Sequence, residues 1–336
     1  MFNGLLLAAV FYFTLGVEDT ADKFMFEYFY YNDWDKIDPM FIYLSKLMNA
    51  YGYNYYAFYR VHIIVYTLSY FLLISRYTNN IFYVFLVFFV LYYVPYVNQI
   101  RYYMAFPFLL LSFHYFVYQR NLWLFALFTF LAVTSHSAII VLYGFFPLYY
   151  FVQSKNFFRA ALLSSGIAFL LVLVLFQMGL IQALEHFGAY AGKGMTSSVS
   201  GGIFNALPYF LYIGYLYLID RRYRRRNPDY EDDKKYRYLS KLSFFTIVFI
   251  PASIFIQILG NRYVFPFLII WVIFFLYLIR KESNTAKFFH FLIFAGVHIA
   301  AGYCIYILAN VVLGESHYEE ELIRSLKSVK YIDFIF

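Results

Sequence analysis

Residues 81–118 read IFYVFLVFFVLYYVPYVNQIRYYMAFPFLLLSFHYFVY, two apolar runs separated only by the polar group Asn98-Gln99-Ile100-Arg101. Each run is long enough to cross a bilayer as a helix, which takes roughly 17–25 residues. Similar runs recur from one end of the chain to the other. Of the 336 residues, 63% are hydrophobic and only 13% are charged, whereas about a quarter are charged in a soluble domain. The sequence therefore predicts an all-α polytopic membrane protein, because helices satisfy their own backbone polar groups in lipid.

The apolar runs predict about eleven transmembrane helices in a single integral membrane domain over residues 1–336. The boundaries carry an uncertainty of a few residues at each end. The expected spans are 2–16, 54–75, 81–97, 99–118, 120–135, 136–152, 158–180, 203–219, 240–259, 263–279 and 288–312.

Lysine and arginine predict the orientation of these spans. The segment 220–241 carries a dense basic cluster that begins at Arg221, and short basic loops favour the cytoplasmic side. With eleven spans the other basic short loops fall on that side too. The outer face then receives the loops 17–53 and 181–202. The net charge of +7 is explained by these loops, so no nucleic-acid partner is expected.

The first outer loop has a helical signal of its own. Asp38 precedes Pro39, a pair typical of a helix start, and apolar side chains then recur at helical spacing. The segment is too short to cross a bilayer. We expect a short amphipathic helix near 39–51 on the outer membrane surface.

Cofactor chemistry has no signature in this chain. Cys304 is the one cysteine, and no pattern of histidine, cysteine and carboxylate has metal-ligand spacing. Phosphate-binding loops and nucleophile-elbow motifs are absent as well. The sequence predicts neither a metal nor a cofactor.

Three arginines at the outer ends of spans are candidate ligands for an anion. Arg101 lies with Asn98 and Gln99, Arg262 follows Asn261, and Arg60 lies near the start of the second span. A guanidinium offers a planar fork suited to phosphate oxygens, so we expect these arginines to bind a diphosphate. The alternatives are an arginine that snorkels at a helix end and, for Arg262, an asparagine-capped turn with a solvated side chain.

The candidate general bases are His136, Asp19 and Glu185. His136 lies between two serines at a predicted outer turn, where an imidazole accepts a proton near neutral pH or bridges two helices by a hydrogen bond. Asp19 and Glu185 follow the first and seventh spans at the outer surface. Both acids also fit a solvated loop, and the sequence leaves these roles open.

Several of these stretches together resemble the EpsG-like and Wzy-type polysaccharide polymerases. The resemblance covers roughly residues 14–150 and a weaker patch near 260. Its elements are Asn98-Gln99-Ile100-Arg101 with Ala105, Ser135-His136-Ser137-Ala138-Ile139-Ile140, Asp19-Thr20, residues 38–44 and Arg262-Tyr263.

The resemblance implies an enzyme that joins undecaprenyl-diphosphate-linked oligosaccharide repeats on the outer leaflet of a bacterial inner membrane. The product is O-antigen, capsule or exopolysaccharide, and the fold is related to lipid-dependent (GT-C-like) glycosyltransferases. By the same analogy the partners are the lipid-linked substrate, membrane lipid and a protein that regulates chain length. Two rival functions remain at this point, a transferase that uses a prenyl-monophosphate sugar and a flippase for the same lipid-linked oligosaccharide.

Overall fold

The computed structural model describes residues 2–32, 38–178, 199–254, 257–308 and 317–329. In these ranges the ordered elements are helices, and the one extended pairing is an isolated antiparallel bridge between Val17 and Val329. The chain divides into two compact units. Unit 1 contains Met1–Tyr143 and His317–Phe336, and unit 2 contains Gly144–Ser316.

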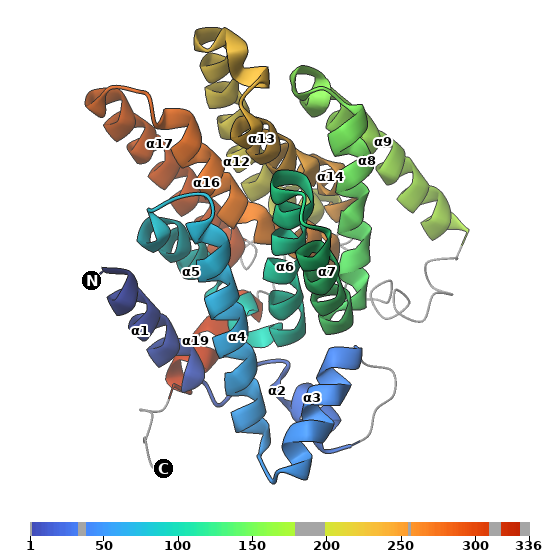
Figure 1. Ribbon diagram of the computed structural model, residues 1–336. Helices are drawn as coiled ribbons and strands as arrows, with labels where there is room; N and C mark the ends of the chain where they lie inside the picture. Colours follow the sequence, from blue (N-terminus) through green and yellow to red (C-terminus); the bar gives the residue numbers. More distant parts are fainter. Residues whose placement is uncertain (1, 33–37, 179–198, 255–256, 309–316, 330–336) are drawn as a thin grey trace. The chain divides into compact units, whose positions relative to one another are not determined.

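Unit 1 is built from helices joined by short connections (Figure 1). They are α1 (Phe2–Leu15), α2 (Lys23–Tyr31), α3 (Pro39–Ala50), α4 (Tyr55–Ser75), α5 (Ile81–Asn98), α6 (Ile100–Phe113), α7 (Leu122–Ser135) and the C-terminal α19 (His317–Lys327). A π-helical turn continues α6 from His114 to Gln119. The helix α19, red in Figure 1, packs against α5 and brings the C-terminal segment beside Val17.

The helix α6 forms the core of unit 1. Almost every side chain of α6 is buried, and its neighbours α4 and α7 cover it. A helix that is apolar on all sides needs such a position. The core around it is aromatic. Tyr66 and Tyr96 meet edge to face with ring centroids 4.7 Å apart, and the Tyr66 hydroxyl donates to the Tyr96 carbonyl at 2.6 Å.

Unit 2 is also helical over its described residues. Its helices are α8 (Phe145–Phe151), α9 (Ser154–Gln177), α12 (Val199–Arg226), α13 (Lys234–Phe245), α14 (Ile250–Ser253), α15 (Gln257–Tyr263), α16 (Leu268–Ile279) and α17 (Asn284–Tyr303). Its core helix is α16, which is buried on nearly all sides.

The all-helical membrane class predicted from the sequence is confirmed. Among the described residues, four helices are long and apolar enough to cross a membrane, namely Tyr55–Ser75, Ile81–Asn98, Gly202–Arg226 and Asn284–Leu308. Shorter apolar helices occupy other expected spans, such as Phe2–Leu15 and Leu122–Ser135. The amphipathic segment near 39–51 is the helix α3. The total of eleven spans remains a prediction.

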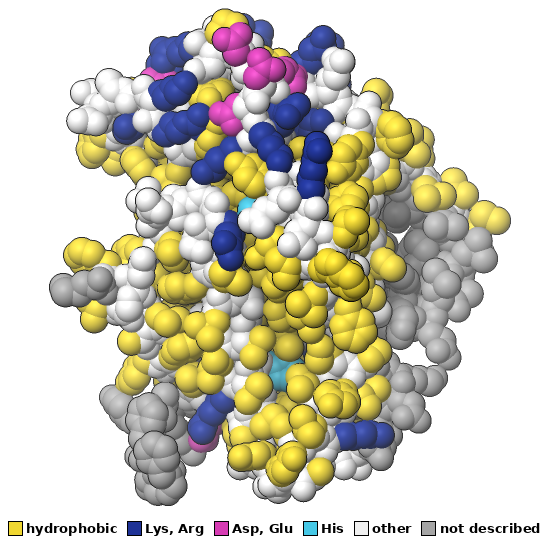
Figure 2. All heavy atoms as spheres, viewed as in Figure 1, with side chains coloured by type: hydrophobic (Ala, Val, Ile, Leu, Met, Phe, Trp, Pro, Cys, Tyr) yellow, Lys and Arg dark blue, Asp and Glu magenta, His cyan; other side chains and the backbone are white. Residues whose placement is uncertain are grey.

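The segment 220–241, expected as a basic loop, is largely helical. The helix α12 continues to Arg226, a 3-10 turn covers Pro228–Glu231, and α13 begins at Lys234. An ion pair of 2.8 Å between Arg224 and Asp220, one helical turn apart, supports the extension. Figure 2 shows lysine and arginine side chains gathered at this end of α12 and α13, at the top of the view.

Candidate functional site

The candidate site of unit 1 is centred on the carboxylate of Asp38. Asp38 precedes the helix α3 with extended backbone angles, and its carbonyl accepts from the backbone N–H groups of Phe41 and Ile42. Its side chain makes no hydrogen bond to the first turn of α3. The carboxylate is buried and instead contacts residues that lie far along the chain.

Arg101 is the first of these partners. Arg101 is the second residue of α6. The single residue Gln99 separates α6 from the preceding helix α5. Arg101 Nη1 donates to Asp38 Oδ2 at 2.7 Å, a distance typical of a charge-assisted hydrogen bond. The guanidinium also lies over the ring of Phe26, 5.2 Å from its centroid, and near Phe41. These contacts hold Arg101 in one orientation.

His136 and Ser137 approach the same carboxylate from another element. The helix α7 ends at Ser135, and His136 has extended backbone angles before a 3-10 helix that begins at Ser137. This break presents His136 Nδ1 to Asp38 Oδ2 at 3.0 Å. The backbone N–H and the hydroxyl of Ser137 donate to Asp38 Oδ1 at 2.9 and 3.1 Å. We call Asp38, Arg101, His136 and Ser137 the Asp38 cluster.

The surroundings decide the charge of Asp38. Burial by itself raises the pKa of a carboxyl group. For Asp38 this effect is outweighed by the hydrogen bond and charge of His136, the charge of Arg101 and the N–H of Ser137, which lower its pKa to about 2. Asp38 is therefore ionised near neutral pH and offers only acceptors to its neighbours.

An ionised Asp38 also selects the tautomer of His136. Since the carboxylate has no proton to give, the hydrogen between Asp38 and His136 belongs to Nδ1. Whenever the imidazole is neutral, its lone pair is then on Nε2. An imidazole oriented in this way by a carboxylate is the arrangement that general-base catalysis uses. The Asp38 cluster thus combines an oriented base with an arginine whose guanidinium carries five N–H donors.

Asn98 and Gln99 flank the cluster at the junction of α5 and α6. Their side-chain carbonyl oxygens, Asn98 Oδ1 and Gln99 Oε1, are buried and make no protein hydrogen bond in the described residues. Two buried acceptors without partners are costly, which fits a position where a hydroxyl-bearing ligand donates to them. The break predicted between the two apolar runs is therefore a junction lined with polar groups.

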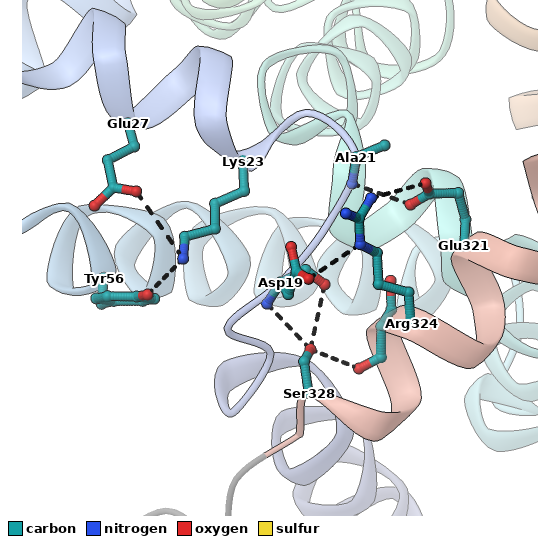
Figure 3. A network of polar contacts seen from close by, with 9 residues as sticks. Asp19, Ala21, Lys23, Glu27, Tyr56, Glu321, Arg324 and Ser328 are labelled. Carbon is teal, nitrogen blue, oxygen red and sulfur yellow. Dashed lines mark hydrogen bonds and ion pairs between the residues drawn. The ribbon is translucent and has the colours of Figure 1, made fainter.

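Asp19 lies at a different place in unit 1, next to the C-terminal helix (Figure 3). Its carboxylate accepts from Arg324 Nε at 3.0 Å, and its backbone N–H donates to the hydroxyl of Ser328 at 3.1 Å. Ala21 N donates to Glu321 of the same helix at 3.0 Å. The contacts of Asp19 and those of the Asp38 cluster share no residue.

Arg60 forms its hydrogen bond with the end of α1 and not with the Asp38 cluster. Arg60 Nε donates to the carbonyl of Leu15 at 3.1 Å, and Arg60 lines a cavity with Glu18 and Tyr56. Glu185 lies outside the described residues.

Arg262 and Asn261 belong to unit 2, and the prediction of a tight turn there is wrong. Residues 257–263 form the helix α15, and Val264 N still bonds back to Gly260 O at 3.0 Å. Gly260 is needed for close packing, because a Cβ there would lie 2.7 Å from the hydroxyl of Tyr209. The chain turns only after Tyr263. Arg262 is half-buried in the last turn of α15, and the side chain of Asn261 lies outside the described residues.

Asp38 and Ser137 are the members of the cluster that reasoning from the sequence missed. Asp38 was interpreted only as the start of a helix, because it precedes Pro39. The sequence offered only a weak signal, because Asp38 is one of seven acids in residues 17–53 and nothing local distinguishes it from the others. Their meeting depends on contacts across 63 and 98 positions of the chain.

Comparison with known proteins gives one match. The model of the EpsG family matches residues 1–313, which is most of the chain and includes the whole Asp38 cluster. The helix α19 lies beyond the matched range. No curated protein matches the chain. No solved structure matches it either.

Proposed function

Because the chain belongs to the EpsG family, whose members are polysaccharide polymerase-like membrane proteins, we propose that it joins undecaprenyl-diphosphate-linked oligosaccharide repeats into a longer glycan. The general assignment to polysaccharide biosynthesis follows from the family. The lipid carrier, the leaving group and the side of the membrane are part of the proposal. One observation carries it furthest, the convergence of Arg101, His136 and Ser137 on the buried carboxylate of Asp38.

The proposed reaction transfers a glycan from its lipid diphosphate to a sugar hydroxyl. The hydroxyl oxygen attacks the anomeric carbon, a new glycosidic C–O bond forms, and the bond from that carbon to the diphosphate oxygen breaks. His136 Nε2 takes the proton of the attacking hydroxyl, and Asp38 stabilises the imidazolium that results. The bonding electrons leave with the diphosphate.

Arg101 has two roles in this proposal. Its Nη1 holds Asp38, and its remaining N–H donors stabilise the negative charge that develops on the leaving diphosphate. Arg262 stays a predicted second ligand of the diphosphate. Asn98 and Gln99 accept hydrogen bonds from sugar hydroxyls, which supplies the partners that their buried carbonyl oxygens lack among the described residues.

The proposal includes the setting of the enzyme. The basic segment 220–241 faces the cytoplasm, and the count of eleven spans along the sequence then assigns Asp38, Arg101 and His136 to the outer leaflet of a bacterial inner membrane. About eleven spans form one membrane domain of the kind seen in lipid-dependent glycosyltransferases. A protein that regulates chain length is the expected partner.

A gel of surface glycan tests this function. A strain without the gene is complemented with the wild-type protein or with His136→Asn, Asp38→Asn or the control Asp232→Asn, which changes an acid in unit 2 outside the cluster. We expect the wild type and Asp232→Asn to produce long chains, and the two cluster variants to leave single repeats on the outer surface. Long chains in the strain without the gene would contradict the polymerase function. Repeats trapped on the inner leaflet would indicate a flippase.

A further inference from the structure

A cavity at the start of α4 lies outside the Asp38 cluster and is not used by the proposed reaction. Its volume is about 400 Å³, within the range of roughly 300–1,000 Å³ that is typical of small-ligand sites. Its walls include Glu18, Tyr53, Asn54, Tyr56 and Arg60. These residues come from the segment after α1, from the turn between α3 and α4, and from the first two turns of α4.

We propose that this cavity binds a sugar unit of the oligosaccharide substrate, at a distance from the bond that reacts. This inference rests on the proposed function. The groups in the walls both donate and accept hydrogen bonds, as sugar hydroxyls do. The rings of Tyr53 and Tyr56 supply the flat apolar surface on which the face of a sugar packs. The carboxylate of Glu18 offsets the positive charge of Arg60 in the same walls, so the charges of these two side chains do not favour a diphosphate over a hydroxyl-rich ligand.

The turn between α3 and α4, which supplies several of the lining residues, is held by contacts within unit 1. Gly52 has a positive φ of 77°, a conformation that glycine adopts at little cost, and its N–H donates to the Asn49 carbonyl at 2.9 Å. The hydroxyl of Tyr30 donates to the Tyr53 carbonyl at 2.5 Å. The side chain of Asn54 accepts from Ala57 N and caps α4. The wall is therefore formed before a ligand arrives, which lowers the entropy cost of binding.

Two further lining residues, Tyr56 and Glu18, are held by contacts with more distant segments (Figure 3). Lys23 Nζ donates to the Tyr56 hydroxyl at 2.7 Å and fixes that ring. Glu18 lies between two residues that the C-terminal segment holds, because Val17 pairs with Val329 and Asp19 bonds to Ser328. Ser328 and Val329, which directly follow α19 and lie beyond the family match, thus position one wall of the cavity.

The helix α3 connects the cavity with the Asp38 cluster. Asp38 precedes its first residue, and Gly52 and Tyr53 follow its last turn. A helix of 12 residues is about 18 Å long at 1.5 Å per residue. A ligand that reaches both ends must extend over several sugar units, as an oligosaccharide repeat does. The cavity then recognises the repeat while the cluster reacts with its end.

Binding to Tyr53→Ala and Tyr51→Ala tests the assignment. Both rings are exposed on the same turn, but Tyr53 lines the cavity and Tyr51 does not. The probe is a set of oligosaccharides of one, two and three repeats, released from the surface glycan of the producing strain, and binding to the full-length protein in nanodiscs is measured by calorimetry. We expect Tyr53→Ala to raise Kd about tenfold, a loss of the size that one aromatic contact provides, and Tyr51→Ala to leave Kd unchanged.

A second variant removes a hydrogen-bond donor without disturbing the helix start. Asn54→Asp keeps an oxygen that caps α4 but loses the amide N–H groups that face a ligand. We expect weaker binding with an unchanged unfolding temperature.

The inference is overturned when Tyr53→Ala binds as tightly as the wild type, when both tyrosine variants lose affinity equally, or when the wild type binds none of the oligosaccharides. These results leave the polymerase function standing. That function fails on the separate observation of long glycan in a strain without the gene.

Discussion

His136 Nδ1 lies 3.0 Å from Asp38 Oδ2, although 98 positions of sequence separate the two residues. The contact joins the break after α7 to the first residue before α3. It assigns a proton to Nδ1, so that Nε2 carries the lone pair whenever the imidazole is neutral.

The variant His136→Asn distinguishes the two candidate roles of His136, that of a general base and that of a structural hydrogen-bond donor. An asparagine amide reaches the position of Nδ1 and donates to Asp38, but it has no group that accepts a proton. We expect the rate of polymerisation to fall by about 10²–10⁴-fold, the usual contribution of a general base. The measurement is the formation rate of long glycan by purified protein in nanodiscs. An unfolding temperature near that of the wild type shows that the fold is intact, and a normal rate would remove His136 from the reaction.

The variant Asp38→Asn lowers both activity and stability. Arg101 would be left beside a neutral amide in a largely buried place, and breaking a buried pair from one side costs about 3–5 kcal/mol. We expect a lower unfolding temperature and no long glycan. Asp232→Asn is the matched control and should match the wild type in both measurements. Asp38→Asn with unchanged stability would mean that the ion pair does not support the fold.

The variants Arg101→Ala and Arg101→Lys should differ in their stability and in the length of the glycan that they produce. Arg101→Ala removes the guanidinium, so we expect it to lose long glycan. The pairing of Arg101 with Asp38 predicts that the alanine variant is also destabilised, because Asp38 keeps a charge without its partner. Lysine restores a positive charge but not the planar fork of donors. We expect Arg101→Lys to be folded, with shorter glycan chains. Normal chain length in both variants would exclude a role for Arg101.

The free energy of unfolding should fall at acid pH because Asp38 becomes protonated. Its pKa is lowered to about 2 in the folded protein, below the ordinary value of about 3.9, so the unfolded chain binds a proton more readily. The stabilisation is fully present above pH 4 and is lost as the pH falls through about 2. It amounts to about 2–3 kcal/mol at 1.36 kcal/mol per pKa unit. Unfolding temperatures between pH 2.5 and pH 6 should decline more steeply for the wild type than for Asp38→Asn. Equal slopes would contradict this assignment.

Two variants of the C-terminal segment should have unequal effects on residues 17–22. The pair of Arg324 and Asp19 is half exposed on both sides, and such pairs contribute about 0–1 kcal/mol. Ser328 bonds to both the N–H and the carbonyl of Asp19. We therefore expect Ser328→Ala to speed hydrogen exchange in residues 17–22 more than Arg324→Ala does. The opposite order would show that the ion pair holds this segment.

Local patterns in the sequence determined the class of protein and the positions of most helices. Runs of apolar residues are a local property, so the helices α4 and α5 and the breaks at 98–101 and 135–137 could be predicted. Arg101 and His136 were recognised because polar side chains at such breaks are unusual. The helices α2 and α19 were missed, since each is short and lies in a segment expected as a loop or a tail.

The tertiary structure alone decided which of these residues act together. Asp38 precedes a proline and looked like an ordinary helix start, yet folding buries its carboxylate between Arg101, His136 and Ser137. Asp19 looked equally suited as a base, but the C-terminal helix supplies its partners. The physical reason is that burial and charge pairing depend on contacts between distant segments, whereas hydrophobic periodicity depends only on neighbours along the chain.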